Sequence, residues 1–380
     1  MISEEKKADI KSFIDYLVAN STAEAPLWNI EKVKGGKPNK WNYIDGCMMT
    51  ALLSLYELTQ DKKYLDFVDG FVGWFVQEDG QIKTYDPEEK NLDNINMGRS
   101  LFRLFDYTGK EKYRKAMDTI RHQIDIQPRT KAGNFWHKDI YPDQVWLDGL
   151  YMAQPFYVEY ETRYNRMSGC IDSFNQFKNV RKLMVDKKTG LYYHGYDESR
   201  KMYWADKKTG CSANFWLRAI GWFACALVDT ADLFDEQLYY EKRTLEKMLW
   251  ELIDALIPWQ SENGLFYQVV NKPEAKGNYE ETSGSALIAY AVLKGVRLGF
   301  LPERYASAGE KILEGLTEHK LIRNGDGTPG LDGICLVAGL GGKDHRDGSL
   351  EYYLSEPVVK NDAKGTAPFI LAFIEMLQRG

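Results

Sequence analysis

Apolar residues follow helical spacing along almost the whole chain. They recur every three or four positions, as in helices with one buried face, and no run alternates as a strand would. We therefore expect an all-α protein. The predicted helices span approximately 4–19, 42–59, 61–77, 93–107, 110–127, 145–160, 166–182, 211–229, 238–257, 279–298, 302–319 and 363–378.

A repeated arrangement groups these helices in pairs. A helix is followed by a short polar turn that contains Tyr, then by a second helix and a glycine-marked loop. The turns at 58–64 and 107–113 follow this arrangement, and loops that begin at Gly133, Gly190 and Gly264 form a second series. Six such pairs that close into a ring predict an (α/α)6 six-hairpin barrel, or toroid.

The two helices of each pair differ in their apolar content. Even-numbered helices of this series are rich in apolar and small residues, as at 284–293, whereas odd-numbered ones are amphipathic, as at 241–247. A helix that is apolar all round belongs inside, and a striped one belongs outside. No composition shift or Ser/Pro-rich linker divides the chain, so we expect a single α/α-barrel domain over 1–380.

Composition excludes several classes of partner. The chain has 380 residues, is 44% hydrophobic and carries a net charge of −6 without a concentrated Lys/Arg block. This balance argues against nucleic acid or an anionic membrane surface as a partner. No apolar run approaches the roughly 18–20 residues of a membrane span, and the N-terminus lacks the apolar core of a signal peptide. We expect a cytoplasmic protein, or a periplasmic one if an export signal has been removed.

Cysteine and histidine usage favours neither disulfides nor a metal. The five cysteines are scattered and odd in number, so we expect them to be reduced core residues. The five histidines show no HxxxH spacing, and no CxxC pair is present. We therefore expect no metal and no cofactor.

One acidic residue lies in a markedly apolar stretch, 144–152. Pro142 marks a helix start, so Asp148 is expected in the first turns of a helix, with Met152 one turn further along the same face. Apolar neighbours disfavour the carboxylate and the helix N-terminus favours it, and these opposed effects suit a group that exchanges a proton near neutral pH. The alternative is a solvated or dipole-stabilised first-turn Asp.

The barrel geometry gathers further candidates at one end. All inner helices run in the same direction, so their N-termini meet at one mouth, where unpaired amides favour an anionic ligand. Asp93 is expected near one of these starts and would face Asp148 across the mouth. Paired carboxylates are typical of glycosidic chemistry. The alternative for Asp93 is an ordinary N-cap.

Arg218 is expected at an otherwise apolar helix start, where a cation needs an anionic partner. One candidate partner is a substrate carboxylate bound bidentately. The other is a structural carboxylate, which Asp93, Asp148 or Glu281 would supply.

Two tryptophans and two histidines complete the candidates. Trp216 and Trp222 flank the arginine and suit either stacking on sugar rings or core packing. His137 and His194 lie in loops that lead to inner helices, and we favour His194 as a ligand of a substrate carboxylate or hydroxyl. The glycine-rich run 337–344 does not complete a nucleotide-binding GxGxxG pattern, and we expect it to form a tight loop that closes the mouth.

These residues lie in stretches that resemble the unsaturated rhamnogalacturonyl hydrolases, glycoside hydrolase family 105. The resemblance runs from about Tyr43 to the C-terminus, and its WLDGLYM-type motif at 146–152 is specific. Asn96, Met97 and Ile220 depart from the residues commoner in that family, which bears on fine substrate preference more than on chemistry. The matching stretches are 135–138, 144–152, 193–199, 215–218, 278–283, 335–342 and 346–357.

The resemblance implies an α/α barrel that hydrolyses small sugars with a C4=C5 double bond, the products of pectin lyases. It implies that Asp148 is the general acid/base, which protonates C4 of the enol ether and then helps water attack C5. The hemiketal opens to a keto sugar and releases the neighbouring residue, expected to be rhamnose. Asp93 would assist, without a metal or organic cofactor. The implied substrate-binding residues are Tyr43, His137, Trp146, Met152, His194, Trp216, Arg218 and Trp222.

Other functions remain open at this point. An unsaturated glucuronyl hydrolase would use the same mechanism. A sugar epimerase or isomerase on the same barrel would rely on paired histidines, for which His137 and His194 are the only candidates. A non-catalytic carbohydrate-binding toroid predicts that Asp148→Asn has no effect. The uronate, the aglycone and the oligomeric state are left open.

Overall fold

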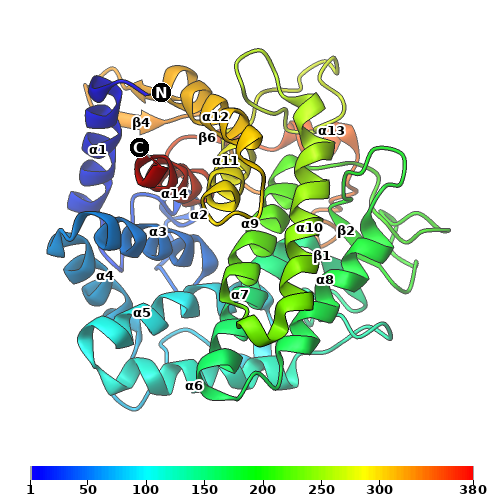
Figure 1. Ribbon diagram of the computed structural model, residues 1–380, viewed down its shortest axis with the longest axis horizontal. Coiled ribbons are helices and arrows are strands. Elements are labelled where there is room, and N and C mark those ends of the chain that lie inside the picture. Colours follow the sequence, from blue (N-terminus) through cyan, green and yellow to red (C-terminus); the bar gives the residue numbers. More distant parts are fainter. Residues whose placement is uncertain (1, 380) are drawn as a thin grey trace.

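The long helices form two concentric rings (Figure 1). The computed structural model describes residues 2–379, apart from the side chains at positions 33 and 34, so the outermost residues of the predicted 1–380 domain lie outside it. Each of the twelve predicted segments contains one long helix. The helices are α1 (Glu4–Ala19), α2 (Ile30–Gly35), α3 (Tyr43–Thr59), α4 (Lys62–Phe75), α5 (Arg99–Thr108), α6 (Glu111–Ile126), α7 (Leu147–Tyr164), α8 (Cys170–Met184), α9 (Leu217–Leu233), α10 (Tyr239–Leu256), α11 (Thr282–Arg297), α12 (Ala306–His319), α13 (Leu350–Ser355) and α14 (Ala363–Arg379).

The inner ring closes on itself. It consists of α3, α5 with the preceding 3-10 helix η2 (Leu92–Gly98), α7, α9, α11 and α14, and each of these packs against the next. The ring closes where α14 packs against α3. The outer ring consists of α1, α4, α6, α8, α10 and α12. This arrangement is the (α/α)6 toroid that the helix pairs predict.

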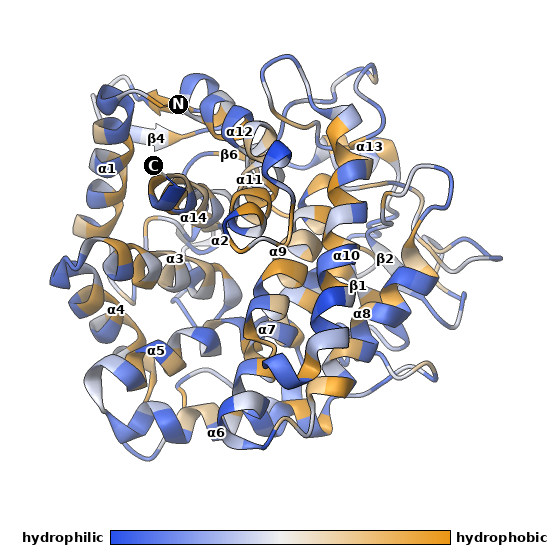
Figure 2. Ribbon diagram, in the orientation of Figure 1, coloured by the Kyte–Doolittle hydropathy of each residue, from blue (hydrophilic) through white to orange (hydrophobic). Residues whose placement is uncertain are grey.

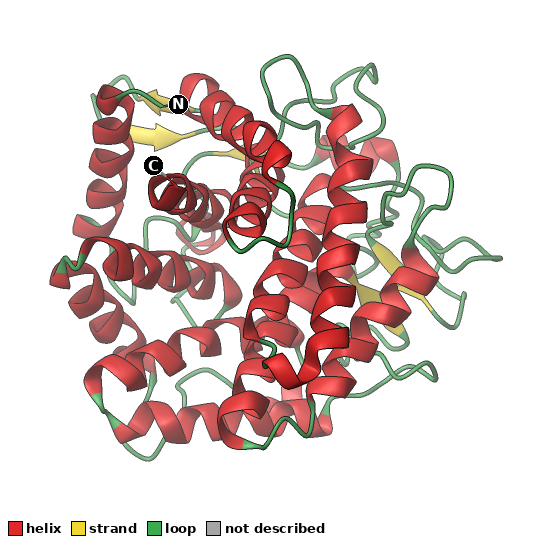
Figure 3. Cartoon of the chain, in the orientation of Figure 1, coloured by secondary structure: helices red, strands yellow, loops and turns green. Residues whose placement is uncertain are grey.

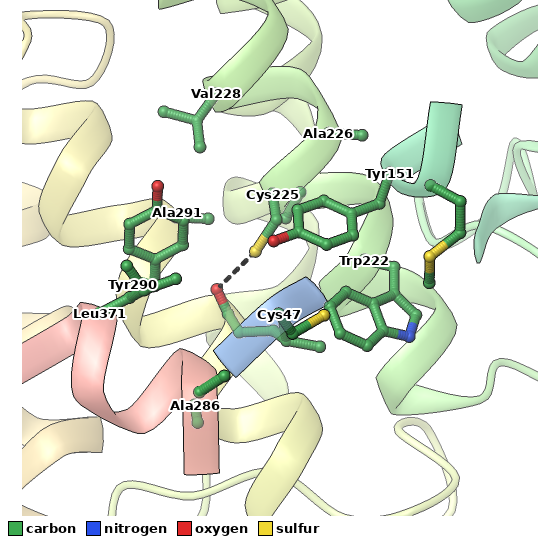
Figure 4. Close-up of a cluster of buried hydrophobic side chains, with 14 of the residues drawn as sticks. Cys47, Tyr151, Trp222, Cys225, Ala226, Val228, Ala286, Tyr290, Ala291 and Leu371 are labelled. Carbon is green, nitrogen blue, oxygen red and sulfur yellow. Dashed lines mark hydrogen bonds between the residues drawn. The ribbon is translucent and has the colours of Figure 1, made fainter. Parts of the chain in front are cut away.

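Burial explains which helices lie inside. Helix α9 is buried at every position from Leu217 to Ala231, whereas α10 buries only one side. Figure 2 accordingly shows hydrophobic residues along much of α9 and α11. In the centre of the barrel, side chains from five inner helices meet in the cluster drawn in Figure 4, which includes Tyr151, Trp222 and Cys225. The five cysteines are all buried and unpaired, as predicted.

A glycine lets two inner helices approach closely near the mouth. A β-carbon at Gly221 of α9 would lie 2.7 Å from Leu287 Cβ of α11, closer than real β-carbons pack. The missing side chain therefore allows the starts of α9 and α11 to lie together, which places Arg218 beside the first turn of α11.

Short strands, which the periodicity does not predict, occur in the loops (Figure 3). Each has only two or three residues, too few to show an alternating pattern. The strands are β1 (Gln144–Trp146) with β2 (Gly195–Asp197), β3 (Leu321–Arg323) with β4 (Pro329–Leu331), and β5 (Ile334–Cys335) with β6 (Val358–Val359). All three pairs are antiparallel.

Two predicted inner helices begin later than expected. The segment 93–107 starts as η2 and becomes α-helical only at Arg99. The segment 211–229 becomes helical at Leu217, because the preceding loop is tied by bridges from Cys211 to Tyr196 and from Trp216 to Val269. Across residues 2–379, every helix is too short or too polar to cross a membrane.

Candidate active site

Asp148 lies in the first turn of α7, at the mouth formed by the inner-helix N-termini. Its side chain is 14% exposed. The residue before the helix, Trp146, belongs to β1 and pairs with Gly195 of β2. The Leu147 amide donates to the carbonyl of His194 at 3.1 Å. These backbone contacts bring the His194 ring beside the carboxylate.

Asp148 and His194 form a pair that is close but not fully bonded. His194 Nε2 lies 3.3 Å from Asp148 Oδ2, and neither atom forms a hydrogen bond with the described residues although both are enclosed. Because Oδ2 is enclosed, Oδ1 is the oxygen open to the mouth. Catalytic hydrogen bonds are often loose without substrate and tighten in the complex, so this spacing fits a pair that transfers or stabilises a proton.

Tyr353 of α13 binds the other ring nitrogen of His194. Its hydroxyl lies 2.7 Å from His194 Nδ1 and has no other hydrogen-bond partner in the described part of the chain. Since a buried O–H needs an acceptor, the hydroxyl donates to Nδ1 and leaves the ring proton on Nε2, facing Asp148. Trp216 stacks on Tyr353, with ring centroids 5.9 Å apart and ring planes at 18°, and its centroid lies 4.7 Å from that of the His194 ring. Sequence reasoning missed Tyr353, although it lies in the matching stretch 346–357.

Asp93 lies in η2 and binds two side chains from the following loop. Lys138 Nζ lies 2.7 Å from Asp93 Oδ2, and His137 Nε2 lies 3.4 Å from Asp93 Oδ1. The cap of η2 is Asn91, whose side chain accepts from the Asp93 amide, so the N-cap interpretation of Asp93 is wrong. Burial alone would raise the pKa of Asp93, but the charge of Lys138, joined by that of His137 once it is protonated in acid, outweighs burial and holds that pKa below its ordinary value.

His137 is held neutral near neutral pH. Burial lowers its pKa to about 4 against the opposing charge of Asp93. Its ring stacks on Trp146 with centroids 4.5 Å apart, and its enclosed Nδ1 has no hydrogen-bond partner among the described residues. Lys138, which neutralises Asp93, was given no role from the sequence, although it ends the matching stretch 135–138.

Trp146 contacts the histidine that lies beside each of the two acidic groups. Besides His137, it contacts His194, with ring centroids 5.4 Å apart. It also stacks on Tyr141, with centroids 5.1 Å apart and ring planes at 19°. Its indole nitrogen donates to Gln144 Oε1 at 3.1 Å, which fixes the ring. The structure therefore brings Asp93, His137, Trp146, His194 and Asp148 together at one mouth.

Arg218 is enclosed by structural partners. It is 1% exposed, and its Nε donates to Ser283 Oγ at 2.7 Å. Its Nη1 donates to the Leu336 carbonyl, and its Nη2 donates to the Cys335 carbonyl and lies 3.6 Å from Glu281 Oε1. Of the two kinds of partner considered for Arg218, the structural carboxylate is therefore the one present.

The remaining predicted residues divide between mouth and core. Tyr43 starts α3, and burial together with the charges of Glu31 and Asp93 raises its pKa. Met152 lies one turn after Asp148 and is buried. Trp222 stacks on Tyr151 at 4.7 Å and 24° inside the barrel (Figure 4), which is core packing.

The glycine-rich run 337–344 reaches this mouth. Leu340 packs against Trp146 and Trp204 in a small apolar cluster. Among residues 2–379, no three His, Cys, Asp or Glu side chains are grouped as metal ligands would be.

Comparison with known proteins agrees with this architecture. A sequence profile described as Glycosyl Hydrolase Family 88 matches residues 17–379. A solved glycoside hydrolase of family 105 from C. acetobutylicum ATCC 824 is 43% identical, with a TM-score of 0.90, and the match covers 99% of this chain and 100% of that one. This chain is a member of the glycoside hydrolase 88/105 group. The resemblance to family 105 and the predicted toroid are thereby confirmed.

Two further relatives are more distant. Unsaturated rhamnogalacturonyl hydrolase YesR of Bacillus subtilis (strain 168) is 25% identical over 264 residues, which are 68% of this chain and 72% of YesR. The unsaturated glucuronyl hydrolase of Bacillus sp. GL1 is 15% identical, with a TM-score of 0.70, covering 99% of this chain and 97% of that one. The second match shows the fold only.

Proposed function

We propose that this glycoside hydrolase acts on small oligosaccharides that carry a 4,5-unsaturated galacturonate linked to rhamnose. The observation that carries the proposal is the carboxyl of Asp148, with one oxygen against His194 and the other open to the mouth. The rhamnogalacturonan part of the proposal is supported by the similarity to YesR.

The reaction begins with the protonated carboxyl of Asp148. Oδ1–H delivers its proton to C4 of the enol ether, and the positive charge that develops at C5 is shared with the ring oxygen. Oδ2, now part of a carboxylate, is stabilised by His194 Nε2–H, which lies 3.3 Å away. A positioned acid of this kind contributes roughly 10²–10⁴-fold to a rate.

The second step uses the same carboxyl as a base. Asp148 takes a proton from water while the water oxygen bonds to C5, so the acid is regenerated. The resulting hemiketal opens to a keto sugar and releases the aglycone. The proton goes to carbon here, in contrast to ordinary glycosidic hydrolysis, where it goes to the leaving oxygen.

Asp93 and its partners Lys138 and His137 would assist. The ionised Asp93 is paired with Lys138 at 2.7 Å, so its charge has a partner. Tyr43 and Trp146 would contact the sugar. An epimerase that uses His137 and His194 as paired acid and base is less well supported, because His137 has a pKa of about 4 and stacks on Trp146.

The test follows the ultraviolet band of the conjugated double bond in an unsaturated galacturonyl-rhamnose disaccharide. Wild type is expected to abolish the band, and Asp148→Asn to lower kcat at least ~10³-fold, about the full contribution of a positioned acid and base. Asp139→Asn, an exposed carboxylate on the loop before Asp148, is the matched control and keeps the wild-type rate.

Each outcome has a distinct meaning. A band that persists at high enzyme concentration with both galacturonyl and glucuronyl substrates contradicts the function. Consumption of the glucuronyl substrate alone keeps the mechanism and changes the specificity. Full activity of Asp148→Asn contradicts the residue assignment.

A further inference from the structure

The mouth needs a cation for the substrate carboxylate, and the two most obvious ones are already occupied. Arg218 is enclosed by Ser283, Glu281 and two carbonyls. Lys138 is paired with Asp93 at 2.7 Å. A uronate that enters this mouth would therefore need a different positive charge.

Arg346 is a half-buried arginine without a carboxylate partner. In the described part of the chain no carboxylate oxygen lies within 4.0 Å of it. Glu356 is near enough for the charge of Arg346 to oppose the burial that raises its pKa, yet it forms no ion pair with Arg346. All the other described arginines that are not exposed have such a partner, namely Arg99, Arg103, Arg114, Arg121, Arg181, Arg218 and Arg379.

The guanidinium of Arg346 is held in place beside Trp146. Its Nε donates to the Gly341 carbonyl at 3.3 Å, and its Nη2 donates to the Tyr141 hydroxyl at 3.3 Å. Tyr141 in turn stacks on Trp146. Nη1 forms no hydrogen bond within the described residues and is not among the enclosed atoms. One edge of the guanidinium is thus oriented but unused.

The glycine-rich loop makes this placement possible. A β-carbon at Gly339 would lie 2.7 Å from Arg346 Nη1 and 3.4 Å from Trp146 Cη2. The absence of a side chain at Gly339 therefore leaves the guanidinium next to the free edge of the indole. This gives the run 337–344 a specific task at the mouth.

We propose that Arg346 binds the carboxylate of the substrate's unsaturated uronate, in the role first expected of Arg218. The proposal rests on the proposed function. A planar guanidinium that is oriented by two hydrogen bonds and lacks an internal carboxylate is suited to a charge-assisted contact with an incoming one. The carboxylate is attached to C5, so this contact would also fix the atom that water attacks.

The experiment compares an unsaturated galacturonyl-rhamnose disaccharide with its C6 methyl ester. Wild type is expected to prefer the free acid. Arg346→Gln should raise KM for the acid at least tenfold with kcat within about threefold, and should lower the acid-over-ester preference at least tenfold. Arg346→Lys, which keeps the charge without the planar fork, should give an intermediate preference.

The matched control is Arg166→Gln. Arg166 is an exposed arginine that forms no ion pair with the described residues, and it follows the C-terminal end of α7, at the opposite end of the barrel. It should leave KM and the preference unchanged. An unchanged acid-over-ester preference in Arg346→Gln, with a wild-type melting temperature, overturns the proposal.

A separate arm distinguishes this proposal from the proposed function. If wild type turns over neither the acid nor the ester, the function fails, and calorimetric binding of galacturonate then tests Arg346 by itself. Weaker galacturonate binding in Arg346→Gln, but not in Arg166→Gln, supports the carboxylate site. Equal binding in all three proteins contradicts it.

Discussion

The two mouths of the barrel use charge in opposite ways. At the N-terminal mouth, the enclosed atoms without a hydrogen-bond partner in the described part of the chain include Asp148 Oδ2, His194 Nε2 and His137 Nδ1. At the C-terminal mouth, a cavity of about 440 Å³ is lined by five cationic and six carboxylate side chains, each of which has an ion-pair partner.

Asp229 shows how completely the C-terminal mouth is paired. It lies 2.7 Å from Arg99 and 2.9 Å from Lys294, and it accepts from the Tyr290 hydroxyl at 2.7 Å. Burial would raise its pKa, but these neighbours hold the pKa far below its ordinary value. Two enclosed atoms of the residues that line this cavity lack a hydrogen-bond partner in the described part of the chain, Thr50 Oγ1 and Arg99 Nη1, and the Arg99 guanidinium lies 5.0 Å from the centroid of the Tyr151 ring.

This difference separates charges that hold the fold from charges that are available for chemistry. Buried polar atoms are almost always hydrogen-bonded, so unbonded ones that gather in one place suggest a site that a ligand completes. The cavity at the C-terminal mouth is the more conspicuous hollow, yet its saturated ion pairs leave little for a ligand to bind. The comparison therefore predicts that removing a carboxylate at the N-terminal mouth lowers activity, whereas removing one at the C-terminal mouth lowers stability.

The largest expected effect is that of Asp229→Asn on stability. The change leaves Arg99 and Lys294 without their shared carboxylate, and breaking a buried ion pair costs about 3–5 kcal/mol. Urea unfolding should show this loss, whereas kcat per folded molecule stays within about twofold of wild type. Asp232→Asn, a 40% exposed partner of Lys294, is the control and should cost at most about 1 kcal/mol. Loss of activity in Asp229→Asn without loss of stability would show that the C-terminal mouth is functional.

A smaller effect is expected on the pH dependence of stability at His137. Its pKa is about 4 in the folded protein and near the ordinary 6.5 when unfolded, so the unfolded chain takes up a proton first as the pH falls. Stability should fall between pH 6.5 and 4, by about 2 kcal/mol at pH 5 from this group alone. His137→Gln should reduce the difference in unfolding free energy between pH 7 and pH 5 by that amount. The same pH dependence in both proteins would contradict the buried neutral ring.

The smallest effect concerns Tyr353, which acts through His194. Tyr353→Phe removes the hydroxyl that donates to His194 Nδ1, so the imidazole is free to carry its proton on Nδ1 instead of Nε2. We therefore expect kcat to fall about tenfold, or ~1.4 kcal/mol, and the pH–rate profile to shift. Tyr192→Phe is a matched control, because Tyr192 is a buried residue whose hydroxyl makes no hydrogen bond with the described residues. A lower melting temperature with an unchanged pH–rate profile would reduce Tyr353 to a structural role.

The helices and their order could be predicted because they depend on local information. Helical spacing and the difference between all-apolar and striped segments decide which helices lie inside, and both are properties of contiguous residues. Asp148 was found in the same way, as one acid in an apolar stretch with a helix-start signal. The delayed start of α9 was missed because it depends on bridges to residues in other loops.

The pairing of side chains was decided by the tertiary structure. Tyr353 meets His194 across 159 residues of sequence, and Arg346 meets Tyr141 across 205. Both contacts arise because ring closure brings the C-terminal loops over the start of α7. The sequence by itself therefore determined the toroid and singled out Asp148 as the acid that we propose for catalysis. Only the closed ring decided which arginine is enclosed and which is left without a carboxylate, since burial and pairing depend on groups distant along the chain.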